Sequence, residues 1–418
     1  MTFTTSYDVV VVGAGAAGLA AGRRLMAAGL EVLVLEARER IGGRAATVPT
    51  PLGTPIDLGC EWLHHADRNP WTGIARELGF AIDETLPDWG RRVAWLSGET
   101  AEREWDAARA DFDQRCEQAA AGAADLSAAA LLPPGGRWNA LLGAISTWAN
   151  GAELERLSVK DRDRYADSEF NWRVLEGYGA LIAAYGAHVP VRLGTAVERI
   201  DHSGRAVMVA TSSGDIRARA AIITLPTNLI AAEAIRFVPA LPEKIAAAAG
   251  LPLGIANKLF LALDGAADDL PQDRHLVGST ERVETGSYQL RPHGWPIIAA
   301  YYGGAFAGAL EAAGSEGMAA FALEELAVLL GSRIKSRLKP LASSVWVADP
   351  FARGSYSCAL PGHADDRAAL AAPVDDRLFF AGEACSRDYF GTAHGAFISG
   401  VAAADQSIAA LGATIALP

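Results

Sequence analysis

The residues best suited to chemistry lie near the start of the 418-residue chain, where three glycines follow a short apolar run. The run YDVVVV at 7–12 predicts a buried strand, and Gly13, Gly15 and Gly18 follow it directly, before a helix-like alanine stretch. In such a turn the first glycine permits the bend, the second lets backbone approach a pyrophosphate, and the third lets helix pack on strand. A second apolar run, EVLVLE, ends in Glu36, at the distance expected of a carboxylate that binds ribose hydroxyls. Because all these parts occur together, a dinucleotide site is favoured over an ordinary glycine-rich turn.

The segment after Glu36 distinguishes between dinucleotides. It reads Arg38-Glu-Arg-Ile-Gly-Gly43-Arg44, and together with the glycine motif it resembles the FAD-binding fold of the glutathione reductase type. In families of that type with this GGR continuation, the glycine pair and the arginine lie close to the FAD pyrophosphate. The resemblance therefore implies FAD rather than NAD.

The C-terminal part of the chain combines a strand-like run, LFFAGE, with a glycine-marked turn and an alanine-rich helix. It resembles the closing flavin motif of the amine oxidase family. The resemblance implies that Glu383 contacts ribityl or phosphate oxygens, and that a helix beginning at Gly391, Thr392 and Ala393 points its N-terminus at the flavin pyrimidine ring. Such a helix end stabilises the negative charge that a reduced flavin gathers. An ordinary capped helix is the alternative.

Three interior segments also resemble the amine oxidases. Residues 57–64 read DLGCEWLH, like the family's DLGxxWxH loop, which runs past the flavin into the substrate cavity. Asn257 and Lys258 match its NK motif, whose lysine hydrogen-bonds a water that touches flavin N5. Residues 346–357 match its W..DP...GSYS segment, whose tyrosine, here Tyr356, forms one wall of an aromatic cage.

Each of these side chains also has a purely structural interpretation. Lys258 would then be an edge lysine whose ammonium reaches solvent from a strand, and Tyr356 a core aromatic. His64 is nearly as well explained as a half-buried, hydrogen-bonded histidine. Glu61 either pairs with a second, remote ammonium of the substrate or faces away and accepts backbone N–H groups.

The resemblance assigns three groups of site residues. The catalytic residues are Lys258 and Tyr356, and the substrate contacts are Glu61, Trp62, His64 and Thr392. The cofactor-binding residues are Gly13, Gly15, Ala17, Gly18, Glu36, Arg38, Gly43, Arg44, Val197, Trp346, Gly382, Glu383, Thr392 and Ala393. Val197 would hold the adenine through backbone groups. No metal site is expected, because the four cysteines and eight histidines show no ligand spacing.

Two positions depart from the monoamine oxidases. Ser355 replaces the cysteine that binds FAD covalently there, and Cys358 would need a shifted frame, so non-covalent FAD is expected. Thr392 replaces the second cage tyrosine. The motifs are closer to polyamine oxidases and histone lysine demethylases, and no long helical insertion or basic arm points to chromatin. A polyamine or other secondary amine is therefore the favoured substrate.

The expected fold is α/β, with a Rossmann-like parallel sheet of the glutathione reductase type and a discontinuous α+β substrate domain. The resemblance places the FAD-binding domain at 1–75, 175–228 and 345–418 and the substrate domain at 76–174 and 229–344. Alanine-rich residues 105–130 look helical, and Pro133–Gly136 is a break, which suits a helical lid.

Composition limits the partners. A net charge of -12 without a clustered basic footprint argues against nucleic acid. No charged segment followed by an apolar one precedes the first strand, so a secretory signal is not expected, and the apolar C-terminal run is too short for a membrane span. A cytoplasmic protein with reduced thiols is expected, and a homodimer is an open alternative for its assembly.

The reaction implied by the resemblance is hydride transfer from the carbon beside an amine nitrogen to flavin N5. Water then hydrolyses the imine to an aldehyde or ketone, and dioxygen reoxidises the flavin and gives hydrogen peroxide. The cofactor carries the difficult step, and the protein positions and desolvates the amine. Two alternatives are a desaturase or protoporphyrinogen-oxidase-like enzyme and a flavin-bearing interaction protein without turnover.

Overall fold

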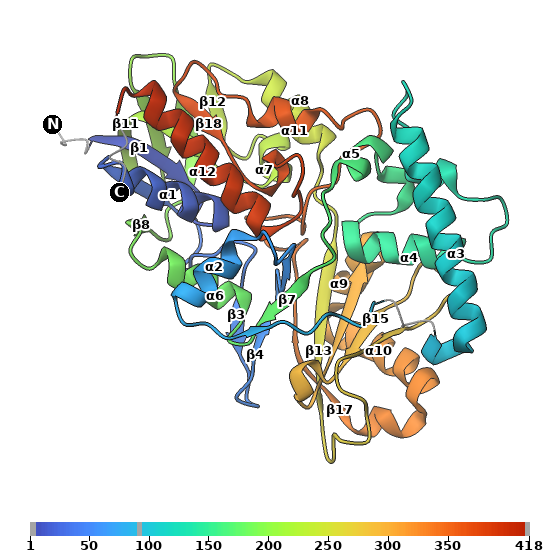
Figure 1. Ribbon diagram of the computed structural model, residues 1–418. Coiled ribbons are helices and arrows are strands. Elements are labelled where there is room, and N and C mark those ends of the chain that lie inside the picture. The colour runs from blue at the N-terminus through green and yellow to red at the C-terminus, as the bar shows by residue number, and fades with distance from the viewer. Residues whose placement is uncertain (1–5, 90–93, 414–418) are drawn as a thin grey trace.

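The computed structural model describes residues 6–89 and 94–413, and its largest sheet has eight strands (Figure 1). The strand order is β12-β9-β10-β11-β1-β2-β8, and β18 pairs with β11. The strands are β1 (Ser6–Val12), β2 (Val32–Leu35), β8 (Val191–Arg192), β9 (Val197–Asp201), β10 (Val207–Thr211), β11 (Gly214–Ile223), β12 (Arg236–Val238) and β18 (Leu378–Phe380). Parallel pairing joins β8, β2, β1, β11 and β18, whereas β9, β10 and β11 pair antiparallel. The predicted α/β fold with a Rossmann-like parallel sheet is confirmed.

Both faces of this sheet are covered, which explains the unbroken apolar run of β1. Val9 and Val11 pack on the face that carries α1 (Ala16–Ala27), α6 (Tyr178–Gly186) and α12 (Ala393–Ala410). Val10 and Val12 pack on the opposite face, against α8 (Pro242–Gly250) and α11 (Asp366–Ala371). Successive side chains of a strand point to opposite faces, so a strand covered on both sides has no polar alternation. In Figure 1 the first helix, α1, lies beside the last, α12.

A second sheet has five antiparallel strands in the order β14-β15-β16-β13-β17. They are β13 (Ala256–Leu263), β14 (Arg274–Val277), β15 (Ser287–Leu290), β16 (Ile297–Gly303) and β17 (Leu338–Ser343). Helices α9 (Gly304–Ala312) and α10 (Gly314–Leu330) share its apolar core. A three-stranded sheet, β5-β7-β6, and a hairpin, β3-β4, connect the two regions; their bounds are β3 (Thr47–Pro49), β4 (Pro55–Asp57), β5 (Trp62–His64), β6 (Ile82–Asp83) and β7 (Asn171–Val174).

Helices α3 (Ala94–Ala120), α4 (Asn139–Asn150) and α5 (Val159–Arg164) form a separate helical group, on the right of Figure 1. We call this group the lid. The predicted helix at 105–130 is confirmed only to Ala120; residues 128–131 form a short 3-10 helix and the Pro133–Gly136 segment is non-helical. The remaining helices are α2 (Pro70–Glu77) and α7 (Thr227–Ala231).

The division into domains stays a prediction. The large sheet takes strands from all three predicted FAD-binding segments, and it also takes β12, which lies beyond the predicted boundary at residue 228. Among the described residues, every helix is too short or too polar to cross a lipid bilayer.

Candidate active site

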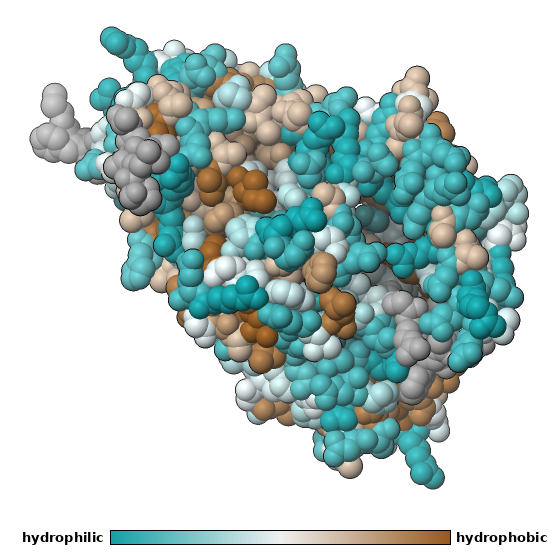
Figure 2. All heavy atoms as spheres, in the orientation of Figure 1, coloured by the Kyte–Doolittle hydropathy of each residue, from teal (hydrophilic) through white to brown (hydrophobic). Residues whose placement is uncertain are grey.

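A cavity of about 1240 Å³ runs between the large sheet, the five-stranded sheet and the lid. In Figure 2 a recess opens on the largely polar face of the molecule, beside α4 and α5, both of which contribute lining residues. Every residue predicted for the site lines this cavity except Gly18. The structure thus brings together side chains and backbone from both ends of the chain and from its middle.

The glycine turn shows why Gly18 is needed without facing the cavity. Gly13 has a φ of 103°, a conformation that favours glycine, and it leads from β1 towards α1. A Cβ on Gly18 would lie 1.9 Å from the carbonyl oxygen of Gly13, so only glycine lets α1 pack on the turn. A Cβ on Gly15 would approach only Gly42 and Gly43, at 3.9 Å or more. This open approach, beside the unblocked N-terminus of α1, suits a phosphate.

Glu36 lies at the end of β2 with its carboxylate buried. One oxygen accepts from the backbone N–H of Ala14 at 2.8 Å and the other from that of Arg38 at 2.9 Å. The Arg38 guanidinium makes a two-pronged ion pair with Asp349, at 2.7 and 2.8 Å. Because Asp349 lies three residues after Trp346, this ion pair holds the segment around Trp346 beside the dinucleotide end of the cavity.

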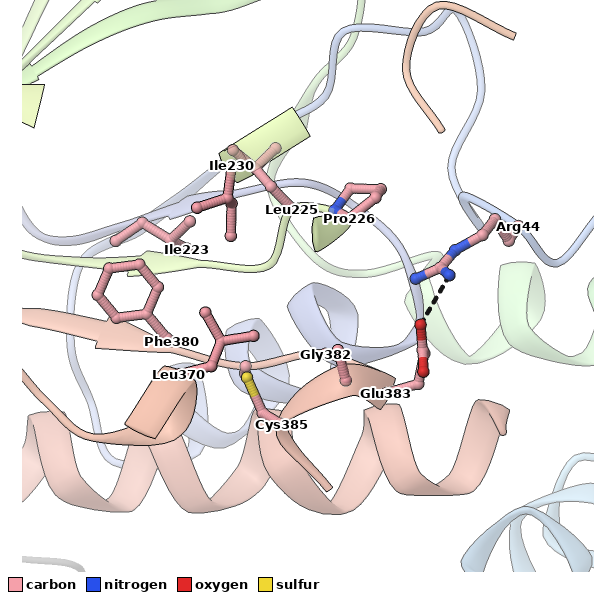
Figure 3. Close-up of a pocket in the computed structure, with 12 residues that line it drawn as sticks. Arg44, Ile223, Leu225, Pro226, Ile230, Leu370, Phe380, Gly382, Glu383 and Cys385 are labelled. Carbon is pink, nitrogen blue, oxygen red and sulfur yellow. Dashed lines mark hydrogen bonds and ion pairs between the residues drawn. The ribbon is translucent and has the colours of Figure 1, made fainter. Parts of the chain in front are cut away.

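Glu383 connects several segments of the site. Figure 3 shows its carboxylate facing the Arg44 guanidinium, and the two form an ion pair at 2.9 Å. Glu383 also accepts from Ser357 Oγ at 2.7 Å and from the Gly391 N–H at 2.8 Å. Burial opposes its ionisation, but Arg44, Ser357 and Arg367 together hold its pKa below the usual range. Glu383 is therefore a fixed anion at the start of the turn that leads to α12.

Lys258 extends from β13 to the loop at 57–61. Its ammonium donates to Glu61 Oε2 at 2.8 Å and to the carbonyl oxygen of Asp57 at 2.9 Å. Tyr301, on the neighbouring strand β16, donates its hydroxyl to the same Glu61 oxygen. Burial raises the pKa of Glu61, but Lys258 and the Tyr301 bond outweigh it and lower that pKa to about 2. The ammonium is thus a buried, paired group, and the solvent-reaching lysine is ruled out by its 6% exposure.

The structural interpretation of Glu61, in which it faces away and accepts from backbone N–H groups, is wrong. Its carboxylate lines the cavity and accepts from two side chains, Lys258 and Tyr301, rather than from backbone N–H groups. A second substrate ammonium would therefore meet a carboxylate that is already neutralised. The substrate contact predicted for Glu61 stays a prediction.

Tyr356 and Thr392 line the cavity at the N-terminus of α12. The Tyr356 hydroxyl donates to the carbonyl oxygen of Trp148 at 2.5 Å, which fixes the ring against the lid helix α4, and burial raises its pKa. Thr392 caps α12 by accepting from the Gly395 N–H at 3.0 Å. An N-terminus capped in this way and facing a cavity favours an anion nearby.

His64 and Trp62 lie on β5. His64 Nδ1 lies 2.6 Å from Asn171 Oδ1, and because an amide oxygen only accepts, Nδ1 carries the proton and Nε2 is left as an acceptor. Burial lowers the pKa of His64, which favours this neutral form. Trp62 stacks under the Arg173 guanidinium, 5.0 Å from ring centre to carbon.

Sequence reasoning missed three residues that organise the site: Tyr301, Asp161 and Arg367. Tyr301 stands in an apolar run that predicts only a buried strand. Asp161 and Arg367 stand in charged stretches, DRDR and DDRAAL, which are typical of exposed helices, yet the two are 3% and 1% exposed. Because the two partners of this buried ion pair are far apart in the sequence, no short segment of the sequence indicates that either residue is buried.

The family model described as flavin containing amine oxidoreductase matches residues 16–170 and 152–408 of this chain. The chain belongs to the flavin-containing amine oxidoreductases. Polyamine oxidase 4 of Oryza sativa subsp. japonica is 31% identical over 434 residues, which cover 96% of this chain and 88% of that protein. A lysine-specific histone demethylase 1 homolog 2 of the same plant is 30% identical over 96% of this chain, but this covers only 56% of that protein.

Among solved structures, wild-type putrescine oxidase bound to putrescine aligns with a TM-score of 0.80 at 21% identity, over 97% of this chain and 100% of that chain. This likeness supports the fold of the flavin amine oxidoreductase. Together the comparisons confirm the predicted family and its resemblance to polyamine oxidases. The chain is thus a flavin-dependent amine oxidase, with an amine as its substrate.

Proposed function

We propose that this amine oxidase binds FAD non-covalently and oxidises a polyamine or another secondary amine with dioxygen. When bound, FAD would accept a hydride from the carbon beside the amine nitrogen and pass electrons to dioxygen, which gives hydrogen peroxide. The observation that carries the proposal is the single cavity that the residues predicted for nucleotide and for amine line together.

The residues present fit FAD at both ends. The glycine approach at Gly15 leaves room for a pyrophosphate beside the α1 N-terminus, and Glu36 offers a buried carboxylate for ribose hydroxyls. At the other end, the α12 N-terminus at Thr392 and Ala393 would favour negative charge on the ring system. Glu383 and Arg44 lie between the two ends of the cavity.

The thiols support non-covalent attachment. Ser355, at the position of the attaching cysteine, uses its hydroxyl to donate to and accept from the backbone of Ala256. Cys358 is buried and lies outside the lining of the cavity, and burial raises its pKa to about 11. Cys60 does line the cavity, but burial raises its pKa to about 12, which keeps it protonated and weakly nucleophilic.

The amine end offers positioning rather than acid–base chemistry. Tyr356, fixed on Trp148, supplies a flat wall, and Phe390 adds apolar surface. The Lys258 ammonium donates two of its three N–H groups, to Glu61 and to the Asp57 carbonyl oxygen, and the third would donate to dioxygen as it gains negative charge. A neutral amine would therefore be bound and desolvated between these groups.

Carboxylates at the mouth support a substrate with more than one positive charge. Glu117, Asp163 and Glu169 line the cavity and are exposed, and among the described residues none of the three forms an ion pair with lysine or arginine. Exposed carboxylates of this kind attract a cation at long range and speed its encounter with the cavity. The names of the polyamine and putrescine oxidases point to the same substrate class.

The test combines cofactor and substrate. The flavin released by denaturation is identified by mass, and peroxide is measured with spermidine, N-acetylspermine and benzylamine. We expect FAD, and a kcat/KM for spermidine that exceeds that for benzylamine and falls more steeply with salt. The variant Glu117→Gln/Glu169→Gln should flatten the salt dependence for spermidine only. Preference for benzylamine, or equal salt dependence, would contradict the proposed substrate, and absence of peroxide with an amine that reduces the flavin would contradict dioxygen as the acceptor.

A further inference from the structure

Arg367, on α11, is a buried cation with four hydrogen bonds. Its Nε and Nη2 donate to the two oxygens of Asp161 at 2.6 and 2.8 Å, and Nη1 donates to Ser357 Oγ at 2.9 Å and to the Ala384 carbonyl oxygen at 3.2 Å. The guanidinium carbon lies 3.8 Å above the ring centre of Phe390, which lines the cavity. The ion pair with Asp161 already compensates the buried charge of Arg367, so the hydrogen bond to Ser357 is not needed to neutralise that charge.

The bond to Ser357 acts on Glu383. The Ser357 hydroxyl has one proton, and it donates that proton to Glu383 Oε2 at 2.7 Å. Arg367 Nη1 donates to one of the two lone pairs of the same oxygen, which favours the orientation in which the Ser357 proton points at Glu383. Arg367 therefore fixes the direction of the bond that holds the carboxylate facing the cavity.

The other end of this chain of contacts lies in the lid. Asp161 belongs to α5, and its side chain also accepts from the Ala359 N–H at 3.3 Å. A continuous set of charge-assisted bonds thus runs from α5 through Arg367 and Ser357 to Glu383. Such bonds are stronger than neutral ones and are directional.

We propose that Arg367 is a positioning residue of the flavin site. Through Ser357 Oγ it fixes the carboxylate of Glu383, and through Asp161 it couples lid helix α5 to the presence of the cofactor. The inference rests on the proposed FAD site, whose sugar and phosphate region Glu383 faces.

The experiment measures release of FAD from diluted holoenzyme by flavin fluorescence. Ser357→Ala removes the hydrogen bond to the Glu383 carboxylate and should raise the Kd for FAD about tenfold, whereas Arg367→Met leaves that bond but no longer fixes its direction and should raise the Kd about threefold. If Arg367 acts through Ser357, the double variant should resemble Ser357→Ala and not show a product of about thirtyfold. Lys244→Met is the matched control. It also removes a buried cation that holds α11, through the carbonyl oxygens of Ala369 and Leu370, and should leave the Kd unchanged.

Hydrogen exchange at residues 159–164 is the second measurement. In the wild type, excess FAD should slow exchange in this segment, and in Ser357→Ala that dependence on FAD should disappear. Ser357→Ala keeps the ion pair of Arg367, so it carries the test if Arg367→Met does not fold. Multiplying effects on the Kd, an unchanged Kd in Ser357→Ala, or an equal effect of Lys244→Met would overturn the inference. Release of a flavin other than FAD from the wild type would contradict the proposed cofactor alone, since the coupling is measured on whichever flavin is released.

Discussion

Replacing Lys258 by methionine should create a stability defect that depends on pH through Glu61. The side chains of Lys258 and Glu61 are 7% and 14% exposed, so the methionine leaves a buried carboxylate with Tyr301 as its one remaining side-chain donor. The difference between the ordinary Glu pKa of 4.5 and the value of about 2 in the fold corresponds to about 3 kcal/mol of stabilisation. Breaking a buried ion pair by removing one partner costs a similar ~3–5 kcal/mol.

The sign of the pH dependence follows from Glu61. In the wild type its folded pKa is lowered, so its stabilisation is present above about pH 4.5 and is lost as pH falls towards 2. In Lys258→Met, burial dominates and raises the pKa of Glu61, so stability is lost as pH rises through that new pKa. Between pH 5 and pH 8 the melting temperature of the variant should therefore fall relative to that of the wild type at the same pH.

The assay is thermal unfolding of the holoenzyme at pH 5 and pH 8. For a chain of this length, 3–5 kcal/mol corresponds to a shift of about 3–6 °C. Lys258→Met/Glu61→Gln removes both charges and should recover most of the loss, and Lys339→Met, which breaks the exposed ion pair with Asp264, should have no effect. A Lys258→Met defect of equal size at both pH values, or one that the double variant does not relieve, would show that the pair is not the cause.

Three further outcomes are expected. Acid or heat precipitation should leave yellow flavin in the supernatant, because Ser355 cannot form a thioether; flavin that stays in the pellet would contradict this. Gly18→Ala should lose flavin or fail to fold, since its Cβ would lie 1.9 Å from a backbone oxygen, whereas Gly73→Ala, with nothing within 4 Å, should be tolerated. In rapid-mixing experiments, Lys258→Met/Glu61→Gln should reoxidise its flavin with dioxygen more slowly than Glu61→Gln, with a smaller difference in anaerobic reduction by the amine; equal reoxidation rates would refute the role of the ammonium.

The sequence was most informative where function is local along the chain. The glycine turn and Glu36 each follow a continuous apolar run that predicts a strand. At Gly18 the packing is so close that only glycine fits. The same holds for the turn into α12, where Thr392 both caps the helix and lines the cavity. In each case one short segment of sequence contains both the strand or helix and the functional residue at its end, so the two can be predicted together.

Partners distant in the sequence could not be predicted. Glu61 and Lys258 were both proposed for the site, but their ion pair joins residues 197 positions apart, and its third member, Tyr301, had no motif. Asp161 and Arg367 are separated by 206 positions, and their surroundings are typical of exposed helices. A periodic pattern reports which face of an element is buried, and it carries no information on which charge lies opposite.

The cavity has two kinds of charged group: buried charges that are paired, and exposed carboxylates at its mouth that, among the described residues, are not. The buried charges are paired inside the protein, as Lys258 with Glu61 and Arg44 with Glu383, because an unpaired charge there would be costly. The carboxylates at the mouth are exposed and carry no such cost, so they can stay uncompensated and act over about a Debye length. Salt should therefore lower kcat/KM for a polycation by slowing its encounter with the mouth, while kcat, which depends on the buried pairs, should change little.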